Sequence, residues 1–276
     1  MTGTAPAGPA VPDLGQFALT VDLAIFTIRD GVFTVLLVQR GSEPFRGRWA
    51  LPGGFVRPDE SVEAAAWREL AVETGMSRFP GHLEQLRTYG DTGRDPRLRA
   101  VSVAHVAFAP DLPDPTTGPS GTGTSSNRTS STRTSSTRTS STRTSSTGAS
   151  STGASMTGPR WWAVEDLEEV PLAFDHAQIL TDAIERVRSK LEYTTLATRF
   201  VSEPFSLKDL YRVYQAVWGL SPDLPGFRRK VLSTNGFVVP VPAPSPEPVL
   251  LYRRGAADVL QPAMLRTTAD DADERE

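Results

Sequence analysis

The chain has 276 residues, of which 38% are hydrophobic, and a formal net charge of −3. This length allows one or two domains with hydrophobic cores, and no apolar run approaches the roughly 20 residues of a membrane-spanning helix. The absence of cysteine excludes disulfides and thiolate metal sites.

Residues 1–17 have neither the basic start nor the apolar core of a signal peptide, so we expect a disordered tail and a cytoplasmic protein without a membrane anchor. Apolar residues then alternate or cluster in residues 19–28, 33–40 and 98–109, which predicts three β-strands.

Between the second and third of these strands, residues 54–76 contain regularly spaced glycine, glutamate and arginine. They fit the spacing G-x5-E-x7-R-E-U-x-E-E-x-G-U, in which U is apolar, with Val72 in place of one glutamate. The matching residues are Gly54, Glu60, Arg68, Glu69, Leu70, Glu73, Gly75 and Met76. Residues 62–74 are rich in strong helix formers, so they predict a helix that Asp59 or Ser61 caps and Gly75 ends.

Positions three and four apart share one face of a helix, so Glu69, residue 72 and Glu73 should project together. Carboxylates gathered in this way bind hard cations such as Mg²⁺, which take oxygen ligands and bind substrate phosphates. The alternative is that Glu69 and Glu73 belong to the solvated face of an ordinary amphipathic helix. The Gly53-Gly54 pair and the nearly complete spacing favour the metal site.

This motif resembles the Nudix box, and the chain is identified as resembling the Nudix superfamily. The resemblance implies an α/β/α sandwich with a mixed sheet. It also implies that Glu69 and Glu73 are catalytic carboxylates, which bind Mg²⁺ or Mn²⁺ with the carbonyl of Gly53. The positions with a structural role in the box are Gly54, Glu60, Arg68 and Gly75. Val72 removes one carboxylate and should weaken metal binding.

Two further segments, residues 49–55 and 84–105, resemble the ADP-ribose pyrophosphatase branch and its regulatory relatives. Arg94 and Arg97 in the second segment suit a diphosphate, because guanidinium groups are planar, always charged and offer forked donors. The alternative is that Arg94 only pairs with Asp95 on a surface turn. The histidines, His82, His105 and His176, have no ligand-like spacing, and none is assigned to the site.

Residues 110–158 interrupt the domain, because Ser, Thr, Arg and Gly repeat there in five-residue units that cannot form a core. We expect a disordered insertion, and its recurring arginines leave a basic nucleic-acid tether as the alternative. Residues 160–167 resume a strand, and residues 174–191 form an amphipathic helix. The Nudix domain should therefore span residues 18–190.

The remaining folded part, residues 191–255, predicts a helix from Ser206, a short helix over 224–234 and two strands joined by a Pro-rich wing. This is the outline of a winged helix-turn-helix, and it resembles the DNA-binding domain of the NrtR family of Nudix-related regulators of NAD metabolism. Residues 199–255 carry eight basic and four acidic side chains, a net charge of +4. The candidate DNA contacts are Arg228, Arg229, Lys230, Arg253 and Arg254.

The resemblance implies a homodimeric regulator that binds ADP-ribose or a related nucleotide and releases an operator DNA. The alternative is a Nudix hydrolase of a nucleoside diphosphate derivative whose C-terminal domain does not bind DNA specifically. Residues 256–276 should form a disordered acidic tail.

Overall fold

A computed structural model describes residues 16–114, 158–242 and 250–266 of the chain. Most of the predicted insertion, the Pro-rich wing and both chain ends therefore lie outside the described residues. No helix in the described segments combines the length and the apolar character that a membrane crossing needs.

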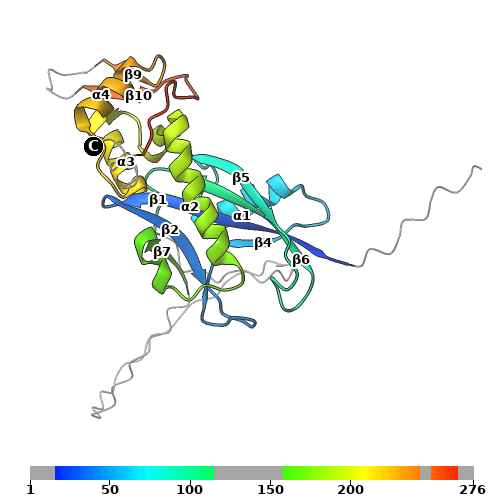
Figure 1. The fold of residues 1–276 in the computed structure, drawn as a ribbon. Helices are drawn as coiled ribbons and strands as arrows, with labels where there is room; N and C mark the ends of the chain where they lie inside the picture. Colours follow the sequence, from blue (N-terminus) through cyan, green and yellow to red (C-terminus); the bar gives the residue numbers. More distant parts are fainter. Residues whose placement is uncertain (1–15, 115–157, 243–249, 267–276) are drawn as a thin grey trace, which may run out of the picture.

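A mixed sheet forms the centre of the first domain (Figure 1). β1 and β6 pair in parallel from Ala18 opposite Ala100 to Phe26 opposite Phe108, and the other pairs are antiparallel. The predicted mixed α/β fold is thus confirmed. The strands are β1 (Ala18–Arg29), β2 (Val32–Gln39), β3 (Trp49–Ala50), β4 (Gly53–Phe55), β5 (His82–Tyr89), β6 (Ala100–Phe108) and β7 (Pro159–Ala163).

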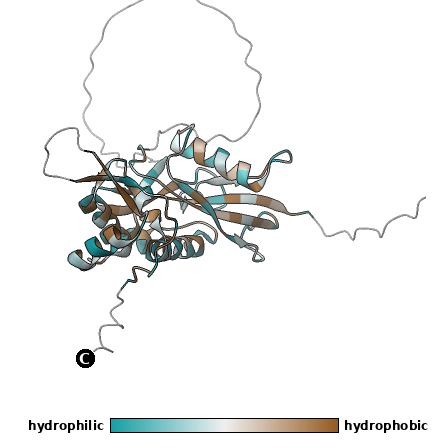
Figure 2. Ribbon diagram, turned by 90° about the horizontal axis from the view of Figure 1, so that it is seen from above, coloured by the Kyte–Doolittle hydropathy of each residue, from teal (hydrophilic) through white to brown (hydrophobic). Residues whose placement is uncertain are grey.

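The two faces of the sheet bury alternate residues of each central strand. In β1, Val21, Leu23 and Ile25 pack with Leu70 of α1 (Val62–Thr74), whereas the even-numbered residues pack against the other face with α2 (His176–Tyr193). Side chains of a strand point alternately to opposite faces, so a strand covered on both sides is apolar at nearly every position. Figure 2 shows this concentration of hydrophobic residues in the strands.

The C-terminal part has the winged helix-turn-helix order. β8 (Phe205–Ser206) precedes α3 (Leu207–Trp218) and α4 (Leu224–Ser233), and β9 (Val238–Val241) and β10 (Leu251–Arg254) follow. β10 lies between β8 and β9 in an antiparallel sheet. Ser206 caps α3 as predicted, because its hydroxyl accepts the Asp209 N–H and Asp209 accepts the Ser206 N–H in return.

The two parts share one hydrophobic core. Phe200, in η2 (Thr195–Phe200), stacks on Phe108 of the sheet with ring centroids 4.5 Å apart. The Trp218 indole donates to the Arg188 carbonyl of α2 at 3.2 Å, and Arg188 donates to the Val217 carbonyl at 3.1 Å. The C-terminal part is therefore bound to the sheet through η2 and to α2 through α3.

Two predicted boundaries need correction. The disordered insertion does not begin at residue 110, since Leu112 is buried in the core and Pro113 accepts the indole N–H of Trp161. The predicted disordered tail does not begin at residue 256 either. Leu260 is buried and donates its N–H to the Tyr193 carbonyl at 2.9 Å, so residues 256–266 form an ordered segment against the end of α2.

Candidate functional site

The Nudix-box helix α1 begins and ends at the predicted residues. The Ser61 hydroxyl accepts the Ala64 N–H at 3.1 Å, so Ser61 rather than Asp59 is the N-cap. Gly75 ends the helix with φ of 68°, a left-handed conformation that glycine adopts without steric cost. The local sequence therefore fixes where the helix starts and stops, and with it the register of its glutamates.

The glycine pair of β4 allows α1 to approach the sheet closely. A Cβ atom on Gly54 would lie 2.2 Å from Glu69 Oε1, and a Cβ on Gly53 would lie 2.2 Å from the Val21 carbonyl oxygen. Both distances are far inside van der Waals contact, so a side chain at Gly53 would collide with the backbone of β1 and a side chain at Gly54 would displace the Glu69 carboxylate. Gly54 thus lets the Glu69 carboxylate lie directly against the backbone of β4.

Arg68 of α1 joins the loop before the helix to the Glu69 carboxylate. Its guanidinium donates to both carboxylate oxygens of Glu60, at 2.6 and 3.0 Å, to the Phe55 carbonyl at 3.2 Å, and to Glu69. The hydrogen bonds from Arg68 and from the Arg57 N–H lower the pKa of Glu60 to about 2. This geometry supports the structural role that the family resemblance implies for Glu60 and Arg68.

Glu73 lies one helical turn from Glu69 on the same helix. Burial, together with the negative charge of Glu69, raises the pKa of Glu73 to about 7. A cation beside Glu73 would offset both effects, so the two carboxylates suit a divalent ion. Val72 is 64% exposed and provides no oxygen ligand. Within residues 16–114, 158–242 and 250–266, no group of three or more His, Cys, Asp or Glu residues could hold a metal ion. The residues fit a divalent ion with fewer carboxylates than the complete box provides.

The two arginines predicted to bind a diphosphate differ in their surroundings. Arg94 is buried, with 6% of its side chain exposed, and donates to both oxygens of Asp175 at 2.8 Å and to Asp22 at 3.3 Å. Carboxylates thus hold the Nε and Nη2 groups of Arg94, and its role in substrate binding stays a prediction. The alternative pairing of Arg94 with Asp95 is wrong, because Asp95 forms its ion pair with Arg97 at 2.6 Å. Arg97 remains 43% exposed.

A buried polar network joins this loop to the glycine pair and to α2. Asp22, which lies opposite Gly53 in the β1–β4 pairing, accepts hydrogen bonds from Ser102 at 2.5 Å and from Arg94. The first residue of α2, His176, has its Nε2 3.7 Å from Asp22 and accepts the Leu51 N–H at Nδ1. Sequence reasoning missed this network because its members are far apart in the chain and have no recognisable spacing.

Some of the predicted DNA-contacting side chains are exposed, and others form hydrogen bonds within the protein. Arg228 and Arg229 on α4 and Arg253 on β10 are exposed. Lys230 donates to the Pro262 carbonyl, and Arg254 donates to the Thr198 carbonyl at 3.0 Å, so these two bind the protein itself. DNA contacts by Lys230 and Arg254 stay a prediction, and to bind phosphate each side chain would have to share or leave these partners.

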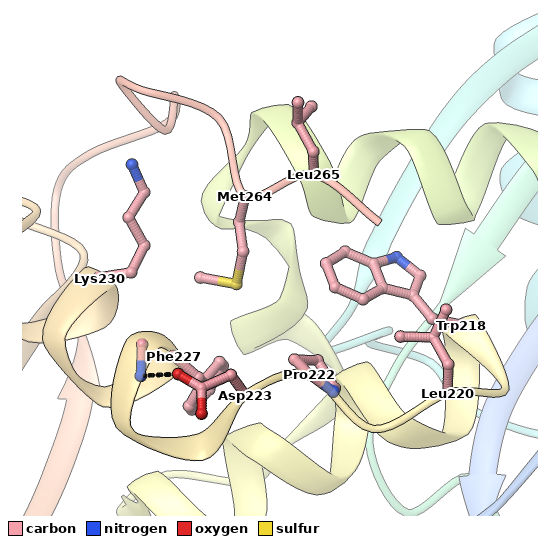
Figure 3. Close-up of a pocket in the computed structure, with 9 residues that line it drawn as sticks. Trp218, Leu220, Pro222, Asp223, Phe227, Lys230, Met264 and Leu265 are labelled. Atoms are coloured by element: carbon pink, nitrogen blue, oxygen red, sulfur yellow. Dashed lines mark hydrogen bonds between the residues drawn. The ribbon is translucent and has the colours of Figure 1, made fainter. Parts of the chain in front are cut away.

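The ordered C-terminal segment lies beside the helix that carries these arginines. Met264 closes one side of a pocket whose other walls include Trp218, Phe227 and Lys230 (Figure 3). At the end of the segment, Arg266 forms an ion pair with Glu192 of α2 at 2.8 Å. The segment therefore connects α4 to the C-terminal turn of α2.

Comparison with known proteins identifies the first domain. The family model described as "NUDIX domain" matches residues 18–129. An ADP-ribose pyrophosphatase of Methanocaldococcus jannaschii is 37% identical over 98 residues, which are 34% of this chain and 56% of that protein. The chain therefore contains a Nudix domain.

Other relatives extend through the C-terminal part. The ADPR responsive transcriptional repressor NtrR of Acinetobacter baylyi is 28% identical over 219 residues, which are 79% of this chain and 73% of that protein. The crystal structure of Shewanella oneidensis NrtR has a TM-score of 0.62 and 29% identity, and the match covers 87% of this chain and 99% of that one. The same protein in complex with a 27mer DNA has a TM-score of 0.60, 29% identity and coverage of 87% and 98%. The chain thus resembles the NrtR family of Nudix-related regulators over most of its length.

Proposed function

We propose that the protein is a transcriptional regulator that binds ADP-ribose or a related NAD metabolite in its Nudix domain and DNA through its winged helix. The observation that carries the proposal is the exposure of Arg228 and Arg229 on the second helix of a winged helix-turn-helix. A second helix in this position enters the major groove of DNA in such domains. The similarity to an ADPR responsive repressor and to a DNA-bound NrtR extends across both domains, which supports the same function.

The effector site consists of the loop and helix of the Nudix box. Mg²⁺ or Mn²⁺ would be held by Glu69, Glu73 and the Gly53 carbonyl, and would neutralise a diphosphate and lower the pKa of a bound water. With Val72 in the box, the site keeps two carboxylates for binding and lacks the third. This composition favours slow turnover, which suits a sensor that must remain bound to its effector.

The second candidate is a Nudix hydrolase of ADP-ribose or another nucleoside diphosphate derivative. It is favoured by the Glu60–Arg68–Glu69 arrangement, which is complete in this chain, and by the similarity to an ADP-ribose pyrophosphatase. Turnover on the order of 1 per second, as in ordinary enzymes, would support this candidate. Weak hydrolysis is compatible with the regulator.

We further propose that the regulator acts as a homodimer with two α4 helices. Two such helices related by a twofold axis read two half-sites about one helical turn of DNA apart. The operator should then be an inverted repeat.

A gel-shift titration with the DNA upstream of its own operon tests the proposal. Wild-type protein should retard this DNA in preference to a scrambled sequence, and ADP-ribose should release it. The Arg228→Ala/Arg229→Ala variant should lose the shift, whereas Arg78→Ala, which removes an exposed arginine in the Nudix domain, should retain it. Equal binding of operator and scrambled DNA by wild-type protein would overturn the regulator and leave the hydrolase.

A further inference from the structure

Three loops at one end of the sheet bring two phenylalanines and three arginines together. Phe45 and Phe174 pack edge to face with ring centroids 4.9 Å apart. The guanidinium of Arg40 lies 4.6 Å and that of Arg97 5.9 Å from the Phe174 ring, and Arg48 lies 5.7 Å from the Phe45 ring. We call these five residues the aromatic–arginine cluster. They come from the β2–β3 loop, the β5–β6 loop and the segment before α2.

Both phenylalanines have backbone conformations that bulky residues rarely adopt. Phe45 has φ of 67° and Phe174 has φ of 55°, in the left-handed region that favours glycine. Such conformations are energetically unfavourable for bulky residues and are concentrated at ligand-binding and active sites. The same two residues provide the ring faces that hold the arginines, so the strained backbone positions the charged groups.

The cluster has more positive than negative charge. Among the described residues, Asp95 pairs with Arg97, whereas Arg40 and Arg48 form no ion pair. Arg40 donates its Nε–H to the Pro44 carbonyl at 2.8 Å, which leaves the N–H groups at the end of the guanidinium without a carboxylate.

The arginines also repel one another. Burial lowers the pKa of Arg40, and the positive charge of Arg97 lowers it further, while Asp95 and Glu43 act in the opposite direction. An anion bound between Arg40 and Arg97 would relieve this repulsion. Arginines held beside aromatic rings present forked donors, which match phosphate oxygens.

The cluster is also linked to the Nudix site. The Phe174 ring lies 5.3 Å from the ring of His176, and His176 accepts the N–H of Leu51, two residues before Gly53. These contacts connect the cluster, through His176, to the loop that leads to Gly53.

We infer that the aromatic–arginine cluster binds a phosphate group of the nucleotide held by the Nudix site, with Arg40 and Arg97 as its principal ligands. Arg94, which the sequence also predicts for this role, is instead sequestered by Asp22 and Asp175. The inference rests on the proposed function only for the identity of the nucleotide as ADP-ribose. Phosphate recognition by the cluster can be tested without that assumption.

The test is isothermal titration calorimetry on the full chain with two probes, inorganic pyrophosphate and ADP-ribose, in buffer without divalent metal. Arg40→Gln and Arg97→Gln should each weaken binding of both probes by about tenfold or more, since each loses a charge-assisted contact. Arg46→Gln is the matched control, because Arg46 lies exposed in the same loop as Arg40 and outside the cluster, and it should bind like wild type. Arg40→Lys keeps the charge but loses the fork, and should bind between wild type and Arg40→Gln.

The outcomes separate this inference from the proposed function. If wild type binds ADP-ribose and both glutamine variants bind it as tightly as Arg46→Gln does, the cluster is not a phosphate site, although the regulator proposal stands. Arginine-dependent binding of pyrophosphate without any response to ADP-ribose supports the cluster and removes ADP-ribose as the effector. Failure of wild type to bind either probe overturns the inference. If Arg40→Gln does not fold, as judged by thermal denaturation, Arg97→Gln and Arg40→Lys decide the result.

Discussion

The backbone N–H of Leu51 donates a 2.8 Å hydrogen bond to Nδ1 of His176, a residue 125 positions further along the chain. Because Nδ1 accepts this bond, the neutral ring must carry its proton on Nε2, which faces Asp22 at 3.7 Å. The bond fixes the loop that leads to Gly53 against the first turn of α2. The last turn of α2 binds the C-terminal segment beside α4, so one helix contacts both the loop before Gly53 and the segment that packs on the winged helix-turn-helix.

Removing the acceptor should destabilise the protein. In His176→Ala the Leu51 N–H remains buried without a partner, which costs about 1–3 kcal/mol in the free energy of unfolding. Urea denaturation at neutral pH measures this change. His176→Asn is the matched control, because its side-chain oxygen can accept the same bond, and it should be less destabilised. Equal losses in both variants would mean that the lost ring, and not the hydrogen bond, sets the stability.

The same histidine should make stability fall in mild acid. Burial lowers the pKa of His176, against the opposing charges of Asp22 and Asp175. Between the unfolded pKa of about 6.5 and the lower folded pKa, the unfolded chain therefore binds more protons. Stability is unaffected by this group above about pH 6.5 and declines as the pH falls below it. Urea midpoints across this range should fall less steeply in His176→Asn, and parallel curves would contradict the assignment.

Metal binding should depend on the ionisation of Glu73. Burial and the charge of Glu69 raise the pKa of Glu73 to about 7, so a cation competes with a proton below that pH. Affinity for Mn²⁺ should rise up to about tenfold per pH unit below about pH 7 and level off above it, as measured by calorimetry. Glu73→Gln should bind more weakly and lose this dependence. A pH dependence retained in Glu73→Gln would place the titrating group elsewhere.

Restoring the missing carboxylate should strengthen the site. Val72 is 64% exposed, so Val72→Glu removes no core packing and adds one oxygen ligand on the helix face that carries Glu69 and Glu73. Mn²⁺ affinity and hydrolysis of ADP-ribose should both increase, while thermal stability stays within about 0.5 kcal/mol of wild type. The neighbouring exposed substitution Ser77→Glu adds the same single negative charge beyond the end of the helix and should change neither property. Unchanged hydrolysis in Val72→Glu would mean that the third carboxylate does not limit turnover.

The sequence predicts the local features of this protein well and the long-range polar contacts poorly. Ser61, Ser206, Gly54 and Gly75 have roles that follow from their immediate neighbours, as caps, close contacts or turns. The carboxylates that bind Arg94 come instead from β1 and from the residue before α2, 72 and 81 positions away. No spacing rule relates such residues, because the fold alone brings them together. The order at 256–266 was missed for the same reason, since Leu260 and Arg266 acquire partners only through α2.

Substitutions of the two adjacent arginines of β10 should have different effects, one on DNA binding and the other on stability. Arg253 is exposed on β10, whereas Arg254 donates to the Thr198 carbonyl and hydroxyl and lies 3.8 Å from Glu203. Arg253→Ala should weaken DNA binding and lower the slope of log K against log salt by about 1, with stability unchanged. Arg254→Ala should lose about 1–3 kcal/mol of stability, because buried acceptors lose their donor, and should keep the salt slope.

Salt-dependent gel shifts and urea denaturation on the same preparations measure both quantities for each variant. The two substitutions delete the same charge one residue apart, so a general electrostatic effect of the basic domain would lower the salt slope in both. That result would show that the wing attracts DNA through its net charge alone. A fall in slope confined to Arg253→Ala would instead identify its guanidinium as a direct phosphate contact, since alternate residues of a strand face opposite sides of the sheet.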